Sequence, residues 1–322
     1  MKAAVYTRYG SPDEINIQEI EKPIPKLDQV LIKVKAACIN SWDWDLLQGT
    51  YFFVRAMGGL FKPKYKILGC DVAGLVESVG ENVTLFKPGD EVFGDLSGDN
   101  FGCFAEYVCG NAKVLAKKPG SISFEEACTI PQAGLLALQG LRKAGEINQG
   151  MHVLINGAGG GVGAFAIQLA KSYGATVTGV DRESKFDMMR SLGADHCINY
   201  LEEDFTKNGK QYDVILENIS THSMFAYWRS LKKNGKFIMT GGRASRIFQL
   251  LFFSWFLSTG GKRLSMLGLK YSPADLDYMA RLVEMGKLKA MIDKTYSLDQ
   301  TAKAFQDFGL GDYKGKLVIA IK

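Results

Sequence analysis

Apolar residues in the first part of the chain alternate with polar ones or form short runs, and they recur at helical spacing in much of the remainder. Short apolar runs bounded by proline and glycine are typical of β-strands. The predicted strands are residues 2–6, 15–20, 29–37, 72–79, 91–93 and 105–109. Helical spacing is scarce before about residue 120, so this part predicts a β domain.

The pattern changes at Ser123, which has the spacing of a capping box with Glu126 ahead of an apolar helix. Beyond it, apolar strands alternate with helical segments. The predicted strands are 151–157, 175–181, 196–200, 212–218, 235–241 and 263–269, with helices at 164–173, 184–192, 222–233 and 244–258. This alternation predicts an α/β fold with a doubly wound, parallel, six-stranded sheet.

The C-terminal part returns to short strands. Helices are predicted at 273–285 and 301–308, and strands at 294–296 and 316–321. We expect these strands to pair with the N-terminal β domain, which makes the parallel sheet an insertion. The predicted domains are therefore 1–124 with 271–322, and 125–270.

A glycine-rich turn joins the first strand of the predicted parallel sheet to its helix. Its residues are Gly157, Ala158, Gly159, Gly160, Gly161, Val162 and Gly163. The strict GxGxxG spacing fails from Gly157, because Val162 stands at the third glycine, whereas Gly157, Gly160 and Gly163 fit a related spacing. Glycines let a backbone approach a ligand, and a helix start attracts phosphate. The turn predicts a dinucleotide site, the alternative being a turn that only packs helix against strand.

Composition excludes several classes of protein. The chain has 322 residues, of which 47% are hydrophobic and 23% charged, as expected for globular domains rather than disordered or fibrous chains. A net charge of +5 without a basic run gives no reason to expect a nucleic-acid partner. The six cysteines form no CxxC pair, and the N-terminus lacks the features of a secretory signal. We therefore expect a cytoplasmic protein with reduced thiols.

Several motifs occur in an order that resembles a known superfamily. They are Gly69-x-Asp71-x-Ala73-Gly74-x-Val76-x-x-Val79-Gly80, Phe86-x-Pro88-Gly89-Asp90-x-Val92-Phe93, Phe104-Ala105-Glu106-Tyr107, the glycine turn, Leu192-Gly193-Ala194-Asp195 with Ile198-Asn199-Tyr200, and Lys314-Gly315-Lys316-x-Val318-Ile319. On these motifs the chain resembles medium-chain dehydrogenases/reductases, and among them the zinc-free quinone oxidoreductase branch. The resemblance implies a GroES-like β domain, a Rossmann domain and a nicotinamide cofactor.

The resemblance also implies an activity. It is the NAD(P)H-dependent transfer of a hydride to a quinone or an α,β-unsaturated carbonyl, with a small hydrophobic substrate and no metal. One alternative is a zinc-dependent alcohol dehydrogenase. Another is a dinucleotide-binding structural or trafficking protein with little turnover. The superfamily further implies a homodimer, formed by edge pairing of the strand at 263–269.

The residues at the expected metal position do not favour zinc. Alcohol dehydrogenases of this superfamily take ligands from a cysteine in an early loop, a Gly-His-Glu element and a later cysteine. By resemblance Asn40 stands at the first of these positions, and Cys70-Asp71 replaces His-Glu. Cys38, Cys70 and Asp71 are not a converging set of cysteine and histidine ligands, so no metal site is expected.

The end of the second strand carries conflicting signals about the cofactor. Asp181 favours NAD, because a carboxylate there accepts a hydrogen bond from the ribose 2′-hydroxyl. Arg182 follows it, and by resemblance Lys185 and Tyr200 contact a 2′-phosphate. We expect NADPH, with NADH as the alternative. The other predicted cofactor-binding residues are Asn218, Gly241, Gly242 and Lys316.

Without a metal, hydrogen bonds must stabilise the charge that develops on the substrate oxygen, and a proton must then be delivered. Asn40 is the candidate donor, with Asp43 and Tyr51 in the same loop as further catalytic candidates. Each has a structural alternative: a loop-capping amide for Asn40, a helix cap for Asp43 and a packed aromatic ring for Tyr51.

The most hydrophobic segment, residues 247–257, is too short to cross a bilayer of ~30 Å, so no transmembrane segment is expected. Basic residues flank it: Arg243, Arg246, Lys262 and Arg263. Three interpretations stay open, namely a buried crossover helix, a wall of a hydrophobic substrate pocket, and a membrane-surface contact for reaching lipophilic quinones.

Overall fold

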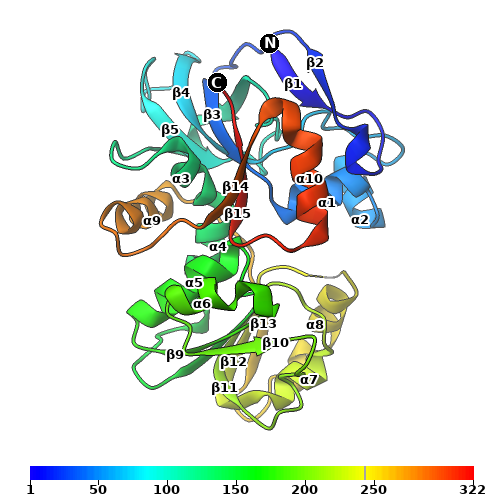
Figure 1. Cartoon of the computed structure of the whole chain (residues 1–322), viewed down its shortest axis with the longest axis vertical. Coiled ribbons are helices and arrows are strands. Elements are labelled where there is room, and N and C mark those ends of the chain that lie inside the picture. Colours follow the sequence, from blue (N-terminus) through cyan, green and yellow to red (C-terminus); the bar gives the residue numbers. More distant parts are fainter. Residues whose placement is uncertain (243) are drawn as a thin grey trace. The chain divides into compact units, whose positions relative to one another are not determined.

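The chain forms two compact units in the computed structural model (Figure 1), which describes residues 1–242 and 244–322, with only the backbone of Ala244. Unit 1 comprises Met1–Gln132 and Tyr271–Lys322, and unit 2 comprises Ala133–Lys270. The predicted boundary at residue 124 stays a prediction. In the structure the capping-box helix α3 (Phe124–Thr129) belongs to unit 1, and α4 (Pro131–Ala144) begins there.

Unit 1 is built on a seven-stranded sheet in the order β14-β15-β3-β4-β5-β7, with β6 also paired to β3. Its strands are β3 (Gln29–Cys38), β4 (Asp71–Val79), β5 (Glu91–Asp95), β6 (Tyr107–Asn111), β7 (Leu115–Lys117), β14 (Ile292–Ser297) and β15 (Lys316–Ala320). A separate two-stranded sheet pairs β1 (Lys2–Val5) with β2 (Asn16–Glu19). The helices other than α3 are α1 (Ser41–Gln48), α2 (Phe52–Gly58), α9 (Pro273–Glu284) and α10 (Thr301–Leu310).

Strands from opposite ends of the chain lie side by side in this sheet (Figure 1). β15 pairs antiparallel with β3, placing Val318 opposite Cys38, and β14 pairs with β15 on its other side. An apolar cluster fills much of the interior of unit 1, and in it Phe305 of α10 packs edge-on against Phe104 with 5.7 Å between ring centroids. Burying one such ring contributes about 1.5–3 kcal/mol.

Three elements of unit 1 are absent from the predicted strands and helices. Helices α1 and α2 lie where helical spacing is scarce, and strand β7 falls in a stretch with no predicted element. α1 is only eight residues long, a length at which tertiary contacts decide whether a helix forms. The contacts of Asp43 in its first turn, described below, supply that support.

Unit 2 is a parallel six-stranded sheet in the order β10-β9-β8-β11-β12-β13. Its strands are β8 (His152–Asn156), β9 (Thr176–Asp181), β10 (His196–Asn199), β11 (Tyr212–Glu217), β12 (Leu231–Met239) and β13 (Arg263–Met266). The helices besides α4 are α5 (Gly161–Ser172), α6 (Phe186–Ser191), α7 (Met224–Arg229) and α8 (Ala244–Leu257). This is the Rossmann strand order, so the predicted fold class is confirmed.

The strand order of unit 2 fixes where a ligand would bind. β8 lies between β9 and β11, so the connections from β8 and β11 diverge beyond Asn156 and Glu217. Ligands of doubly wound sheets bind at such a switch point, outside the carboxyl ends of the strands. The predicted glycine turn begins there. Among the described residues, no helix combines the length and apolar character that a membrane crossing requires.

Candidate functional site

The glycine turn brings the start of α5 close to the end of β8. A Cβ at Gly163 would lie 2.4 Å from both the Cα of Ala158 and the carbonyl oxygen of Gly157, so only glycine fits there. A Cβ at Gly159 would lie 2.4 Å from Cδ of Lys185 and 3.0 Å from a carboxylate oxygen of Asp181. The turn is therefore tight, and the N-terminus of α5 presents its free N–H groups at the switch point.

Asp181 is directed into this turn. Its Oδ2 accepts a hydrogen bond of 2.8 Å from the backbone N–H of Gly159, and its Oδ1 accepts one of 2.8 Å from the N–H of Arg182. The ammonium group of Lys185 lies 3.3 Å from the same Oδ1, and both side chains are buried. The carboxylate thus stabilises the turn and already has a partner for each oxygen.

Arg182 and Tyr200 lie at the surface beside Asp181. Nε of Arg182 donates to the hydroxyl of Tyr200 at 2.8 Å, and Tyr200 is about half exposed. The structure therefore brings together, at the end of β9, the residues that the sequence predicted for cofactor discrimination: Asp181, Arg182, Lys185 and Tyr200.

A second network joins the ends of β8, β11 and β12. The buried Glu217 accepts hydrogen bonds of 2.9 Å at both carboxylate oxygens from Nδ2 of Asn156, and one of its oxygens accepts the N–H groups of Ile219 and Ser220. Nδ2 of Asn218 donates to the carbonyl of Asn156 at 2.8 Å. The network sets the shape of the loop that follows β11.

This network also reaches the predicted residues after β12. The hydroxyl of Ser220 donates to the carbonyl of Gly241 at 3.0 Å, and Gly242 adopts a φ of +130° against Ser220. Asn156 and Glu217 were not predicted. The sequence does indicate them, because each is a polar residue at the carboxyl end of a buried strand, which is where doubly wound sheets bind ligands.

Unit 1 contains a buried polar group of five residues, here called the Lys316 cluster. Asn40 precedes α1, Cys70 and Asp71 lie at the start of β4, Asp95 ends β5 and Lys316 begins β15. The sheet register places Asp71 opposite Asp95. All five side chains are nearly or fully inaccessible to solvent.

Asn40 links the members of the Lys316 cluster. Its Nδ2 donates to Asp71 Oδ2 at 2.9 Å and to Cys70 Sγ at 3.2 Å, while its Oδ1 accepts a hydrogen bond from the Lys316 ammonium. That ammonium also donates to the carbonyl of Ile39 at 3.1 Å and lies 3.7 Å from Asp71 Oδ2. The backbone N–H of Gln132 donates to Asp71 Oδ1 at 3.1 Å, so both oxygens of Asp71 are engaged.

Burial dominates the electrostatics of the cluster. It raises the pKa of Asp71 to about 7, against the opposing effects of Lys316 and the Asn40 amide. Burial likewise raises the pKa of Asp95, and it raises the pKa of the Cys70 thiol well above its usual range. Burial acts to lower the pKa of Lys316, but the thiols and carboxylates around it, chiefly Cys38 and Asp71, outweigh that effect and raise it. Lys316 is therefore a cation.

The other two catalytic candidates lie in different surroundings. Asp43 is fully buried and accepts hydrogen bonds of 2.8 Å from the N–H groups of Asn40 and Gly69, and burial raises its pKa to about 7. Tyr51 lies at the surface before α2, where its ring stacks on Phe53 with 5.8 Å between centroids. The structure brings Asn40 and Asp43 into contact, whereas Tyr51 stands apart at the surface.

Comparison with known proteins identifies the family. Residues 26–120 match the alcohol dehydrogenase GroES-like domain, and residues 192–319 match the family described as zinc-binding dehydrogenase. A chloroplastic quinone-oxidoreductase of Triphysaria versicolor is 33% identical over 99% of this chain and 98% of its own. The chain belongs to the medium-chain dehydrogenase/reductase superfamily and is quinone-oxidoreductase-like.

Two further members of this superfamily are similar over the whole chain. The chloroplastic NADPH-dependent alkenal/one oxidoreductase of Arabidopsis thaliana is 33% identical over 99% of this chain and 79% of its own. The structure of the quinone oxidoreductase from Coxiella burnetii superposes with a TM-score of 0.88 and is 30% identical, covering 100% of this chain and 99% of that one.

Some members of this superfamily bind zinc, so the donor set of unit 1 must be tested against that metal. Among the described residues, Cys70, Asp71 and Asp95 bring ligand atoms within 4.8 Å of one another. They offer one cysteine and two carboxyl groups, and the Lys316 ammonium already pairs with Asp71. Cys38 contacts Cys128 instead, at 3.3 Å between sulfurs. A set with a single cysteine, no histidine and an ammonium group already paired with one of its carboxylates does not fit zinc.

Lys316 is the predicted cofactor-binding residue that belongs to unit 1, whereas the glycine turn, Asp181, Asn218 and Gly242 lie in unit 2. Its cofactor contact stays a prediction. What the structure shows is a buried ammonium that orients Asn40 and balances the charge of Asp71.

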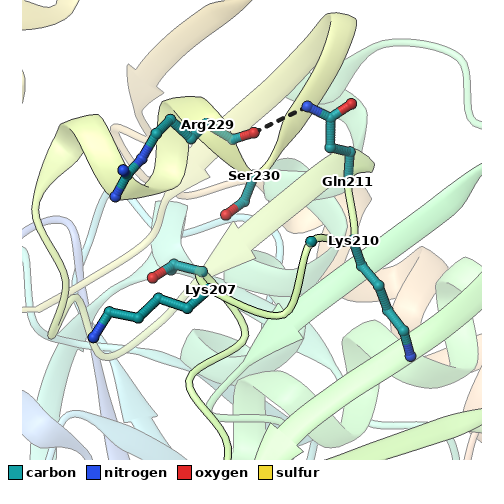
Figure 2. Close-up of a pocket in the computed structure, with 7 residues that line it drawn as sticks. Lys207, Lys210, Gln211, Arg229 and Ser230 are labelled. Atoms are coloured by element: carbon teal, nitrogen blue, oxygen red, sulfur yellow. Dashed lines mark hydrogen bonds between the residues drawn. The ribbon is translucent and has the colours of Figure 1, made fainter.

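A pocket of about 420 Å³ lies on unit 2 away from these residues (Figure 2). Its lining is Thr206, Lys207, Gly209, Lys210, Gln211, Arg229 and Ser230. The side-chain amide of Gln211 donates to the carbonyl of Arg229 at 3.1 Å across it, and Lys207 pairs with Asp204 at 3.1 Å. It contains none of the predicted site residues, so we give it no part in the reaction.

Proposed function

We propose that this protein transfers a hydride from NADPH to a quinone or an α,β-unsaturated carbonyl without a metal. The observation that carries the proposal is the Lys316 cluster, where an ammonium group pairs with Asp71 among the residues that would have to hold zinc. The names of the relatives support the substrate class, because they are quinone oxidoreductases and an alkenal/one oxidoreductase. The alternative of a zinc-dependent alcohol dehydrogenase lacks a fitting ligand set.

A bound nicotinamide dinucleotide would supply the hydride. The N–H groups at the start of α5 would bind its diphosphate, with Asn218, Gly241 and Gly242 at the same edge of the sheet. The NADPH preference is supported by Asp181, whose oxygens already accept the N–H groups of Gly159 and Arg182. A carboxylate engaged in this way is a poor partner for a 2′-hydroxyl, while Arg182 provides a positive charge for a 2′-phosphate.

Addition of a hydride to a conjugated carbonyl places negative charge on its oxygen, and a hydrogen-bond donor stabilises that charge until a proton arrives. We assign the donor role to Asn40. Its two amide protons are directed at Asp71 and Cys70 in this structure, so it donates to a substrate by releasing one of these bonds. The bond to the Cys70 sulfur, at 3.2 Å, is the weaker of the two, so this is the bond that breaks when Asn40 donates to the substrate. Tyr51 or water delivers the proton.

Asn40→Ala tests this assignment. We expect turnover to fall by roughly tenfold to a hundredfold, because one donor to a developing oxyanion is lost, while the dissociation constant for NADPH stays the same. Steady-state kinetics and cofactor titration measure the two effects separately. A variant that keeps full turnover removes Asn40 from the site and leaves it the structural role of orienting Asp71.

The activity itself is tested with a panel of quinones and enones. We expect NADPH consumption by the purified protein, faster than with NADH, and less than one equivalent of zinc in elemental analysis. Tight NADPH binding without turnover of any substrate in the panel would favour the alternative of a dinucleotide-binding structural or trafficking protein. A full equivalent of zinc with alcohol oxidation would favour the alcohol dehydrogenase.

We further propose a homodimer. Support comes from β13, which is the last strand of the six-stranded sheet and has only β12 as a neighbour in that sheet. An edge strand offers backbone groups to a second copy of itself. Light scattering on the purified protein decides between dimer and monomer. The cytoplasmic location likewise stays a prediction, and fractionation of the source cells tests it.

A further inference from the structure

Helix α8 presents an uncovered apolar face. Two of its leucines, Leu250 and Leu257, are buried in the core of unit 2. The remaining surface of the helix exposes Phe248, Leu251, Phe252, Phe253, Trp255 and Phe256, and the exposed fraction reaches 75% for Phe252 and 80% for Trp255. A helix that is apolar on all sides is ordinarily buried. The exposed residues of α8 are called the α8 face below.

The neighbouring helix extends the α8 face. α7 lies beside α8 (Figure 1), and its Phe225 is more than half exposed and packs on Phe253 with 5.8 Å between ring centroids. Two adjacent helices therefore contribute aromatic side chains to one surface. Contiguous exposed apolar surface of this kind marks a site of interaction rather than scattered surface hydrophobicity.

The charge around the α8 face has one sign. Residues 218–274, which include α7, α8 and β13, contain no aspartate or glutamate. Their basic residues are Arg229, Lys232, Lys233, Lys236, Arg243, Arg246, Lys262, Arg263 and Lys270. Lys232 pairs with Asp213 outside the stretch, and Arg243 lies outside the described residues. Arg246 donates to the carbonyl of Thr221 and the amide oxygen of Gln249, and Lys262 donates to the carbonyl of Trp228. These neutral acceptors hold the cations near α8 without cancelling their charge.

We propose that the α8 face is a docking surface for an anionic lipid bilayer. α8 has 14 residues, about 21 Å, which is too short to span the hydrocarbon but suits a helix lying in the plane of the interface. Phenylalanine and leucine enter the acyl region, tryptophan prefers the headgroup level, and the surrounding cations attract anionic headgroups. The proposal does not depend on the reaction that the protein catalyses.

A second copy of the chain fits the α8 face less well. A symmetric contact would bring the same patch of each copy together, and with it Arg246 and Lys262 of both. No acidic residue of the stretch is available to pair with them, so like charges would face each other across the contact. An anionic bilayer supplies the missing negative charge and buries the aromatic side chains at the same time.

The test is co-sedimentation with lipid vesicles made of phosphatidylcholine alone or with added phosphatidylglycerol. We expect the protein to sediment with the anionic vesicles, less so at high salt, and the fluorescence of Trp255 to shift to the blue. The variant Phe252→Ser with Trp255→Ser should weaken binding at least roughly tenfold, because two exposed aromatic anchors are lost. Its NADPH affinity should match that of the wild type, which shows that unit 2 is still folded.

A matched control replaces two exposed apolar residues of unit 1, Ile24→Ser with Leu310→Ser, and should sediment as the wild type does. Arg263 follows α8 in the sequence. Arg263→Glu should reduce binding to the anionic vesicles and leave binding to phosphatidylcholine vesicles unchanged. The proposal is overturned if the wild type leaves both kinds of vesicle unbound, or if the Phe252/Trp255 variant binds as well as the wild type. A third result also overturns it: the wild type is a dimer in light scattering, the Phe252/Trp255 variant is a monomer, and neither protein binds vesicles. The α8 face would then be a contact between two copies of the chain.

Discussion

The proposed cofactor preference rests on single residues at the end of β9. Asp181 alone would indicate NAD, but its contacts with Gly159 and Lys185 turn it into a part of the phosphate turn. In the proposed function, discrimination between the two cofactors then passes to Arg182, whose guanidinium lies at the surface against Tyr200. The residue types were visible in the sequence, whereas the direction of the Asp181 carboxylate was not, because it depends on a hydrogen bond to a backbone group 22 positions away.

Arg182→Ala is expected to weaken NADPH binding by roughly tenfold to a hundredfold, since a charge-assisted hydrogen bond to phosphate contributes about 1.5–3 kcal/mol. NADH lacks the 2′-phosphate, so its dissociation constant should stay unchanged. Fluorescence titration with both cofactors measures the difference. Arg190→Ala is the matched control, because Arg190 lies on α6 and pairs with the exposed Asp187. Equal weakening for both cofactors would contradict the assignment.

Asp71 makes stability depend on pH. Its pKa is raised from 3.8 to about 7 by burial, so the folded state binds its proton more tightly than the unfolded state does. The stabilising contribution is present below about pH 4 and is lost as the pH rises to about 7. The loss is at most about 4 kcal/mol.

Urea unfolding across this pH range measures the effect. In Asp71→Asn the free energy of unfolding should fall less as the pH rises, because this carboxyl no longer titrates. Asp43, whose pKa is also raised to about 7, and the buried Asp95 still contribute to the fall. Asp187→Asn, a change at a fully exposed side chain, serves as the control. A pH profile that is the same in Asp71→Asn and the wild type would show that Asp71 does not titrate in this range.

At the scale of elements, the alternation of strands and helices after residue 123 made the parallel six-stranded sheet of unit 2 predictable. Unit 1 was less so. α1 forms because Asp43 accepts the N–H groups of Asn40 and Gly69, the second of which comes from a distant segment. Likewise, the Lys316 cluster joins residues from β4, β5 and β15, and local spacing contains no information about such contacts.

Gly163→Ala should damage the glycine turn. The added methyl group would lie 2.4 Å from the backbone of Gly157 and Ala158, which cannot yield as a flexible side chain does. We expect a loss of about 1–3 kcal/mol in the free energy of unfolding, together with weaker NADPH binding. Gly160→Ala is the control in the same turn, because its Cβ would lie 3.7 Å from the nearest atom. Equal stability of the two variants would contradict the packing described here.

At the scale of the whole molecule, the two units depend differently on the order of the chain. Unit 2 is a continuous segment, Ala133–Lys270, whereas unit 1 needs β14 and β15 to complete the sheet that begins with β3. This arrangement is expected from the sequence, because the strands near the C-terminus need partners and the N-terminal β domain can supply them. The exact residue at which one unit ends depends on contacts of α3 and α4 that no local pattern specifies.

Deleting residues 316–322 should therefore unfold unit 1 selectively. β15 lies between β14 and β3, so its loss separates β14 from the sheet, exposes the edge of β3 that β15 covers, and removes the cation beside Asp71. Hydrogen exchange should show protection lost in residues 29–38 and 71–79 and kept in 152–156 and 212–217. A truncation ending after residue 320 keeps β15 and is the control. Retained protection of residues 29–38 in the shorter chain would contradict the prediction.

The insertion of unit 2 also sets an order of events during synthesis. A ribosome makes the chain from its N-terminus, and all six strands of unit 2 have been made once residue 266 is in place. The sheet of unit 1 still has an open edge at β3 then, because its neighbour β15 begins only at residue 316. The nascent chain therefore holds a completed Rossmann fold next to an incomplete β sheet, and the last strand to be made also delivers the lysine that neutralises Asp71.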